Sequence, residues 1–287
     1  MTCRVLSASH YLQPVRDGDA LPPLDQALKQ ICREHFRRTD RFIKLALLGS
    51  ARCAAGHGLK TDCGIYLGTG FGPVASNVAA QEEMLRDAQL PKPFDFVNTL
   101  GVSAGFHVAK NLGLTSQNLC ISRRGASLMA VLTAAFTDME LGLVGQALVG
   151  VVEEVTLPLD EHRLRRGLAA DTAVAEGSHW LLLEAGGDAG RTLHLQRFWE
   201  FPVLEAELGS RRRAADRLCL ARSMEEAATG KLQRRFPDTY SGDLAGAFHD
   251  NLEAAWVAEF AAGGSPGSLF LADGGHKRGF SLLHLGA

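Results

Sequence analysis

Apolar residues recur at helical spacing in several stretches of the chain, with capping or breaking residues at the ends of most of them. Thr39 and Asp40, for example, precede a stretch that is apolar on most sides, so we expect a buried helix there. Gly56 ends that stretch. The spacing predicts helices over residues 22–37, 41–55, 73–88, 98–112, 126–140, 211–235 and 244–262.

Short apolar runs bounded by turn residues predict the strands. Because most of these runs alternate with helices, we expect a mostly parallel sheet covered on both faces. The stretch 156–175 reads as irregular and basic, and the sequence has no short-period repeat. The predicted strands are 63–67, 119–122, 147–152, 180–184 and 192–201, then a terminal hairpin of 268–271 and 280–283 with its turn over 273–279.

Composition narrows the class of protein. Of the 287 residues, 46% are hydrophobic and 22% are charged, so a sizeable core can form. The net charge of −2 gives no basic excess for binding nucleic acid. No uncharged apolar run approaches the roughly 20 residues of a membrane helix. The first ten residues lack the apolar core of a secretory signal, so we expect a cytoplasmic protein.

Cysteines and histidines give no sign of a metal centre. The six cysteines form no C-x-x-C pair, and the ten histidines are dispersed without metal-ligand spacing. Without a secretory signal, we interpret the cysteines as reduced and mostly buried. We therefore expect neither a bound metal nor a cofactor.

The order of the motifs is more specific than any one of them. Asp40-Arg41-Phe42 and an apolar helix come first, then I-Y-L-G-T-G-F-G at 65–72. In this order, above all between Asp40 and Ala185, the chain resembles the β-ketoacyl synthases of the thiolase superfamily. The later motifs are PKPFDFVNTLGVSAGFHVAKNLGL at 91–114, NLCISRRGASLMAVLTAAFTDMELGLVGQALVGVVEEV at 118–155, AEGSHWLLLEA at 175–185 and LFLADGGHKRGFSLLHL at 269–285.

The resemblance implies an α/β protein with the thiolase-like layered αβαβα fold. In that family, the second half of the chain repeats the β-α-β topology of the first. Residues 1–190 would form the ketosynthase-like first half, and residues 191–287 a degenerate, shortened second half packed on it. We therefore expect the second half to have lost elements.

The chain departs from the family where a condensing enzyme carries its nucleophile. In the family, a catalytic Cys begins the buried helix, where the helix end lowers its pKa and backbone N–H groups form an oxyanion hole. Counting back from Glu153 and Glu154 places that position at Gly125. Cys120, on the preceding strand, is expected to point away into the core, and Ser127 is not aligned. The elbow consists of Ser122, Arg123, Arg124 and Gly125.

The two catalytic histidines of the family are missing as well. One belongs to a His-Gly-Thr-Gly-Thr motif and the other follows a Lys-Ser-Asn run, and the sequence contains neither. His249 falls in a predicted helix and is interpreted as a partly exposed helix residue. His276, beside Gly274 and Gly275 in the terminal turn, is interpreted first as a loop residue, although the family has a loop near its active site there.

A condensation needs a nucleophile, a base and an oxyanion partner together. The resemblance therefore implies a non-condensing homologue without independent condensing activity. Its closest type is a chain length factor, which pairs with an active ketosynthase in polyketide, aryl-polyene or fatty-acid-type biosynthesis. Two alternatives stay open. One is an altered acyl-transfer enzyme, such as a malonyl-carrier-protein decarboxylase, and the other is a homodimeric scaffold that binds acyl carrier protein.

The resemblance also indicates candidate contact surfaces. In this fold, the strand before the elbow pairs with its two-fold mate across a dimer, so we expect an active ketosynthase or a second copy there. Residues near that seam are candidates for an acyl-tunnel floor or for ordinary packing: Phe94, Phe96, Leu100 and Phe106. Acyl carrier proteins are strongly acidic, so basic clusters are candidate docking residues, or else solvated helix ends: Arg163, Arg165 and Arg166, and Arg211, Arg212 and Arg213.

The elbow arginines need a separate explanation. Two adjacent cations at a helix N-terminus are unfavourable against the helix dipole. Arg123 and Arg124 therefore either pair with a carboxylate, which another subunit could supply, or extend into solvent.

Overall fold

The computed structural model describes residues 2–33, 38–186, 190–240, 246–263 and 266–286. Its strands form one hydrogen-bonded sheet in the order β3-β2-β4-β5-β1-β6-β9-β8-β7. The strands are β1 Thr2–Val15, β2 Gly64–Thr69, β3 Asn118–Ser122, β4 Gln146–Glu153, β5 Val174–Ala185, β6 Thr192–Phe198, β7 Arg217–Leu220, β8 Leu269–Gly275 and β9 Gly279–Gly286.

Helices follow most of these strands in the chain. The α2 helix illustrates the local rules, because the Asp40 side chain accepts a hydrogen bond from the Ile43 N–H and so caps the helix. The helices are α1 Asp25–Ile31, α2 Arg41–Ala54, α3 Val74–Leu85, α4 Pro93–Asn98, α5 Gly101–Leu112, the 3₁₀ turn η1 Arg124–Ala126, α6 Ser127–Glu140, α7 Leu159–Arg166, α8 Phe201–Arg211, α9 Glu226–Arg235 and α10 Leu252–Ala262.

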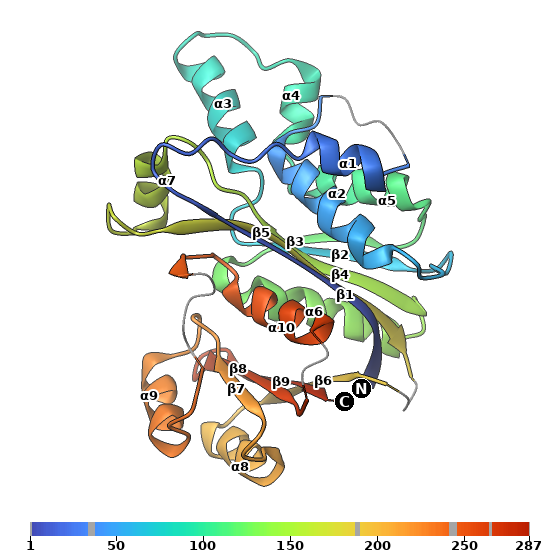
Figure 1. Ribbon diagram of the computed structural model, residues 1–287, viewed down its shortest axis with the longest axis vertical. Helices are drawn as coiled ribbons and strands as arrows, with labels where there is room; N and C mark the ends of the chain where they lie inside the picture. The colour runs from blue at the N-terminus through green and yellow to red at the C-terminus, as the bar shows by residue number, and fades with distance from the viewer. Residues whose placement is uncertain (1, 34–37, 187–189, 241–245, 264–265, 287) are drawn as a thin grey trace.

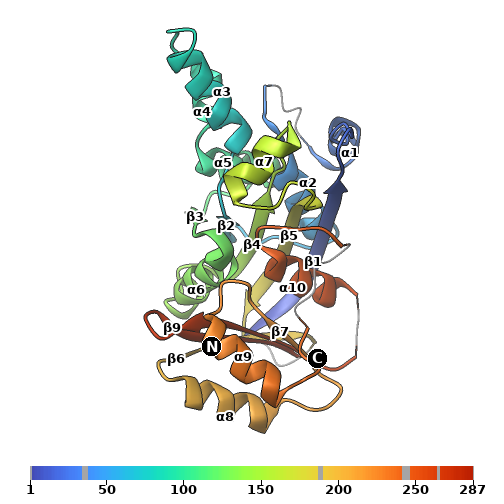
Figure 2. The same cartoon turned by 90° about the vertical axis from the view of Figure 1, so that its left-hand side faces the viewer.

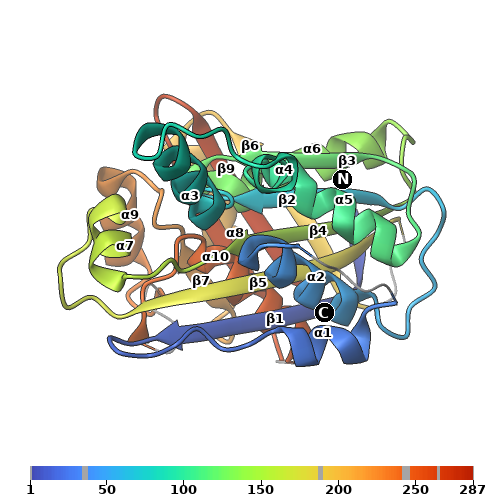
Figure 3. The same cartoon turned by 90° about the horizontal axis from the view of Figure 1, so that it is seen from above.

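The elements stack in five layers, as expected for the αβαβα fold (Figure 1). Helices α1, α2 and α5 cover the sheet part made by β1–β5. Helices α6 and α10 fill the middle, and the part made by β6–β9 lies beneath them with α8 and α9 outermost. The short pairing of Thr2–Arg4 with Thr192–His194 joins the two parts of the sheet. Seen from above, the strands of the two parts cross (Figure 3).

The second part of the sheet repeats the strand order of the first. The series β1-β5-β4-β2 has two antiparallel pairings and then a parallel one, and β6-β9-β8-β7 has the same sequence of pairings. Strand β3 extends the first series by a parallel pairing with β2. Among the described residues, the second series has no counterpart of β3.

The central helices build a core that both halves share. Leu132 of α6, Trp256 and Val257 of α10, and Leu271 of β8 belong to one buried apolar cluster. Helix α6 packs on β2, β3 and β4, and α10 packs on β1, β5 and β8. The start of α6 is therefore held in the middle of the molecule, between the two parts of the sheet.

Several sequence-based expectations need correction. Among the described residues, five of the eight strand pairings are antiparallel, so the prediction of a mostly parallel sheet is wrong. The 14-residue strand β1 lay in a segment with no predicted element, and its pairings with β5 and β6 account for two of the antiparallel ones. The stretch 156–175 contains helix α7.

The predicted helix boundaries fail mainly in the second half. The stretch 211–235 contains strand β7 before α9 begins, and the stretch 244–262 is helical only from Leu252. Residues 34–37 and 244–245 of two predicted helices lie outside the described residues. Helix 98–112 begins at Gly101, after the separate short helix α4.

Candidate functional site

Strand β3 leads into α6 through a tight elbow. Arg124, the first residue of the 3₁₀ turn, has φ 48°, a left-handed conformation that costs a side-chain-bearing residue on the order of 1 kcal/mol. The nearby hydroxyls are used by the backbone. Ser122 Oγ donates to the Gly70 carbonyl at 3.0 Å, and Ser127 Oγ lies 2.7 Å from the Thr69 carbonyl oxygen and accepts from the Arg123 N–H. The two hydroxyls are thus occupied in holding the elbow.

Gly125 faces residues of the second half. A Cβ built on Gly125 would lie 3.5 Å from the Ser223 Cβ and 3.9 Å from the Asp250 carbonyl oxygen. Cys120 packs, as predicted, against the apolar cluster that includes Leu45 of α2 and Val108 of α5. Burial raises the pKa of its thiol to about 11. At the turn itself, Gly125 has no side chain, and the hydroxyls of Ser122 and Ser127 are hydrogen-bonded to backbone carbonyl groups.

An aromatic ring and two guanidinium groups occupy the space beside the elbow. Phe71 follows β2, and the guanidinium of Arg166 lies 3.6 Å from the centroid of its ring, while that of Arg124 lies 4.9 Å away. Arg166 Nε donates to Asp250 at 2.6 Å, and both side chains are largely buried. This stack ties α7 to the loop before α10 directly next to the elbow. It compensates the charge of Arg124 by a cation–π contact.

Two carboxyl groups at the end of β4 are fully enclosed. Glu153 accepts hydrogen bonds from the Gly70 N–H and the Asn251 side chain, and burial, reinforced by the charge of Asp250, holds its pKa well above the usual range. Glu154 accepts from the Ala75 N–H at 2.8 Å, and burial raises its pKa to about 8. Both residues anchor the loops after β2.

Three histidines are in contact between β1, β5 and the loop before α10, and two of them, His179 and His249, are buried. His249 Nδ1 lies 3.0 Å from the Ala175 carbonyl, so it donates that hydrogen bond, and its Nε2 lies 3.1 Å from His179 Nε2. The ring of His10 stacks on that of His179 at 4.9 Å. Burial lowers the pKa values of all three imidazoles. His249 is fully buried outside α10, so its interpretation as a partly exposed helix residue is wrong.

The terminal hairpin approaches the elbow and leaves a cavity of about 360 Å³ beside α6. Gly274 has φ 132° and is so close to β9 that a Cβ would meet the Gly279 carbonyl oxygen at 2.3 Å. Gly275 lies next to Glu225, whose carboxylate accepts from the His276 N–H. The His276 side chain itself is 61% exposed, in keeping with a loop residue.

The predicted tunnel or interface residues lie on the surface of this chain. Phe94 and Phe96 on α4, Leu100 before α5 and Phe106 on α5 are between 46% and 59% exposed. Leu119 on the edge strand β3 is 40% exposed. Helices α3 and α4 project above the rest of the fold, as Figure 2 shows. We call these five exposed apolar residues of α4, α5, the residue before α5 and β3 the β3 surface, since α4 packs on α5 and α5 packs on β3.

The basic clusters are mostly tied up within the chain. The side chains of Arg163 and Arg166 are 5% and 2% exposed and pair with Asp17 and Asp250, so the docking prediction is wrong for these two. Arg165, Arg211 and Arg212 pair with Glu161, Glu207 and Asp238. Arg213 is exposed, and no ion pair of its side chain is present within the described part of the chain. Carrier-protein docking by the remaining arginines stays a prediction.

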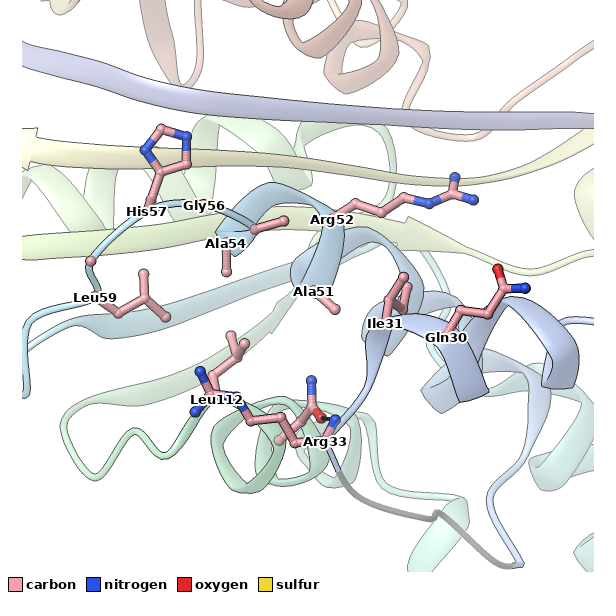
Figure 4. A pocket seen from close by; sticks show the side chains of 13 residues that line it. Gln30, Ile31, Arg33, Ala51, Arg52, Ala54, Gly56, His57, Leu59 and Leu112 are labelled. Carbon is pink, nitrogen blue, oxygen red and sulfur yellow. Dashed lines mark hydrogen bonds between the residues drawn. The ribbon is translucent and has the colours of Figure 1, made fainter.

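Another cavity, of about 810 Å³, lies between α1, α2 and the end of α5 (Figure 4). Its polar side chains do not converge, because Arg52 and His57 point away from one another. No group of three His, Cys, Asp or Glu side chains within the described ranges can hold a metal ion. Likewise, no helix in the described ranges is long and apolar enough to cross a membrane.

Solved structures with the same arrangement are ketosynthases and their chain length factors. The ishigamide ketosynthase/chain length factor matches with a TM-score of 0.71 at 14% identity, over 99% of both chains. A type II polyketide synthase acyl-carrier protein in complex with its ketosynthase matches with 0.67 at 13% identity, over 100% of this chain and 99% of that one. A β-ketoacyl synthase from Burkholderia phymatum STM815 matches with 0.63 at 15% identity, over 94% and 86%.

The chain has the ketosynthase fold. No protein-family model and no curated protein matches the sequence, and at these identities the likeness establishes the fold alone. Gly125 and the left-handed Arg124 share the turn into α6.

Sequence reasoning missed most of the side chains around the elbow. Asn251 and Asp250 lie outside the motifs, Phe71 stands in I-Y-L-G-T-G-F-G without a predicted role, and Arg166 was predicted only as part of a basic cluster. Glu153 alone had a signal, since it ends the Gly-x-x-Glu-Glu strand of the resemblance. The remaining contacts join segments far apart in the chain and become visible only when the layers are stacked.

Proposed function

We propose that this chain is a non-condensing ketosynthase homologue that pairs with an active ketosynthase, as a chain length factor does, in polyketide, aryl-polyene or fatty-acid-type biosynthesis. The observation that carries the proposal is the elbow, where the turn into α6 holds two arginines and a glycine but no nucleophile. The group of three histidines supports it, because His249 is enclosed and bonded to Ala175 and is thus withheld from acting as a base.

The first test asks whether the chain accepts an acyl group. We expect the purified protein to gain no mass after incubation with hexanoyl coenzyme A, measured by intact mass spectrometry. Burial raises the pKa values of Cys53 and Cys120 to about 11, so these thiols are poor nucleophiles near neutral pH. A covalently labelled residue in the wild-type protein would contradict the proposal.

Gly125→Cys is the matched positive control for that test. The new Cβ would make ordinary contacts with Ser223 and Asp250, so the fold should tolerate it. A thiol at a helix N-terminus beside two arginines has a lowered pKa, and we expect it to take the acyl label. Condensation should remain absent, because the base is still missing. A condensation product formed by this variant would show that the remaining catalytic groups are present.

The edge of the sheet supports the choice of partner. Strand β3 is the outermost strand of its part of the sheet, and its free edge runs beside the β3 surface. An exposed strand edge flanked by exposed aromatic rings is a template for pairing with another chain. One structural neighbour is a ketosynthase and chain length factor together, which favours a ketosynthase as the occupant of this edge.

The second test measures that pairing. We expect co-expression with a ketosynthase that has its Cys and two His intact to give a one-to-one complex by native mass spectrometry. Leu119→Asp should abolish the complex, because it places an unpaired charge at the edge strand. Leu164→Asp is the matched control, since Leu164 on α7 is 80% exposed and away from β3.

Two results would overturn the pairing. One is a stable homodimer that excludes the ketosynthase, which would favour the scaffold alternative. The other is an intact complex with Leu119→Asp, which would place the interface elsewhere.

An acyl carrier protein is the further partner we propose, because one neighbour holds a carrier protein with its ketosynthase. Release of carbon dioxide from malonyl carrier protein by the chain alone would favour the decarboxylase alternative instead.

A further inference from the structure

The cavity of about 360 Å³ beside α6 adjoins the turn into that helix, and its lining combines arginines with small apolar residues. It lies between the start of α6, the end of β3 and the terminal hairpin, and its size is within the range of small-molecule sites. Its lining comprises Ile121, Arg123, Ala126, Met129, Ala130, Thr133, Ala134, Arg197, Asp273, Gly274, Arg278, Gly279 and Ser281.

Positive charge exceeds negative charge in this lining. The lining includes three arginines, Arg123, Arg197 and Arg278, and one carboxylate residue, Asp273. The Asp273 carboxylate is already engaged, since it accepts from Arg278 Nη2 at 2.9 Å and from Ser223 Oγ at 2.7 Å. Arg197 Nη2 donates to the Arg278 carbonyl at 2.8 Å, and its guanidinium is not in an ion pair within the described residues. The Arg197 guanidinium also lies 5.1 Å from the centroid of the Trp199 ring, and Arg123 and Arg197 are both exposed, so both are accessible to an anionic ligand.

The N-terminus of α6 adds positive electrostatic potential to the cavity. Arg123 immediately precedes the 3₁₀ turn into α6, where the helix dipole is positive, and the first turn of α6 has no acidic residue. The neighbouring Arg124 is stacked on Phe71, whereas the exposed side chain of Arg123 has no ion pair within the described parts of the chain. An anion in the cavity would relieve this concentration of positive charge.

The rest of the lining is apolar and small. Met129, Ala130 and Ala134 present one face of α6, and Ile121 closes the side toward β3. The small alanine side chains leave room for a short aliphatic chain, which would bury apolar surface against them. A hydrated inorganic ion would make no such apolar contact. The cavity therefore combines a cationic end with an apolar floor.

We propose that this cavity binds a short aliphatic carboxylate, with the carboxylate between Arg123, Arg197 and Arg278 and the chain along α6. Arginine donors match a carboxylate in geometry and charge. The lining comes from this chain, so binding is measured on the chain without a ketosynthase, although Ile121 belongs to the strand that we propose pairs with one. The two proposals can fail separately, because the chain can form the complex with a ketosynthase without binding the carboxylate, or bind the carboxylate without forming the complex.

Isothermal titration calorimetry of the purified full chain tests the site. The probes are hexanoate, its uncharged analogue hexanamide, and inorganic phosphate. We expect hexanoate to bind roughly tenfold or more tightly than hexanamide, because a charge-assisted hydrogen bond is lost in the amide. Phosphate should bind more weakly than hexanoate, because it leaves the apolar floor uncovered.

Variants separate the two ends of the cavity. Arg123→Gln should weaken hexanoate roughly tenfold, and Ala130→Leu should block the floor without changing the charge. Arg123 is exposed, so its replacement spares the fold. Arg86→Gln on α3, an exposed arginine paired with Glu82, is the matched control and should leave the affinity unchanged.

Three results would overturn the proposal. The first is equal affinity for hexanoate and hexanamide, and the second is a wild-type affinity in Arg123→Gln. The third is a combined result, in which phosphate binds as tightly as hexanoate and Ala130→Leu changes neither affinity. The apolar lining along α6 would then contribute nothing to binding.

Discussion

The residues around the elbow serve as structure where a condensing enzyme would carry its chemistry. Arg166, Phe71 and Asp250 fill the space beside Gly125, and the two nearby serine hydroxyls hold the backbone. The turn between β3 and α6 could be predicted from the sequence, because the order of the motifs places it at residues 122–125. The contacts around the turn could not be predicted, because the sequence does not tell whether an arginine of a basic cluster is solvated or buried against an aromatic ring.

Buried carboxyl groups give the protein a stability that depends on pH. The pKa of Glu154 is about 8 in the fold, against 4.5 for the free side chain. Its contribution is therefore fully present below pH 4.5 and is lost as the pH rises through 8, by at most about 1.4 kcal/mol per pH unit for one group. The three histidines act in the opposite direction. The lowered pKa values of His10, His179 and His249 give a contribution that is present above pH 6.5 and is lost on acidification.

We expect Glu154→Gln to flatten the decline in the free energy of unfolding between pH 6.5 and 8.5. The amide keeps the oxygen that accepts from the Ala75 N–H and has no proton to lose. Urea denaturation at several pH values measures the slope. Glu82→Gln, at an exposed residue on α3, is the control and should keep the wild-type slope. A wild-type slope in Glu154→Gln as well would mean that this carboxyl does not titrate in the range.

At the scale of elements, the sequence pattern predicted those helices and strands whose signals lie within their own residues. Helix α2 and the strands β2, β3 and β4 fall within a few residues of their predictions, because each has its own apolar run and end signals. Strand β1 was missed because it lies in the middle of the sheet and packs on two sides, so its apolar and polar residues do not alternate cleanly. The four residues of β7 were too few to interrupt a helical pattern.

The seating of α2 on the sheet depends on one position without a side chain. A Cβ at Gly49 would lie 2.3 Å from Ser178 Oγ and 2.4 Å from Trp180 Cδ1, both on β5. We expect Gly49→Ala to lower the free energy of unfolding by roughly 1–3 kcal/mol, because α2 must lift from the sheet. Gly58→Ala is the control, since its Cβ would meet no heavy atom within 4 Å. Guanidinium denaturation that finds the two variants equally stable would contradict this close packing.

For the whole molecule, the sequence suggested two halves divided near residue 190, and the layers show how closely these halves are joined. Helix α10 belongs to the second half by chain order, yet it packs on β1 and β5 of the first. Strand β1 bridges the two parts of the sheet through Thr2–Arg4. The resemblance implied the layered fold but could not supply this interlocking, because it depends on contacts between the first residues of the chain and the last third.

The interlocking predicts a single cooperative unfolding transition. Trp180 reports on the first half, and Trp256 and Trp199 report on the second. A Trp199→Phe, Trp256→Phe variant retains only the first-half reporter, and its fluorescence midpoint should coincide with the midpoint of its far-ultraviolet circular dichroism. Residues 191–287 alone should show no cooperative transition, because α10 would lose the strands it packs on. Separate midpoints, or a folded fragment, would mean that the two halves are independent domains and that the shared core around Trp256 and Leu132 adds little to their stability.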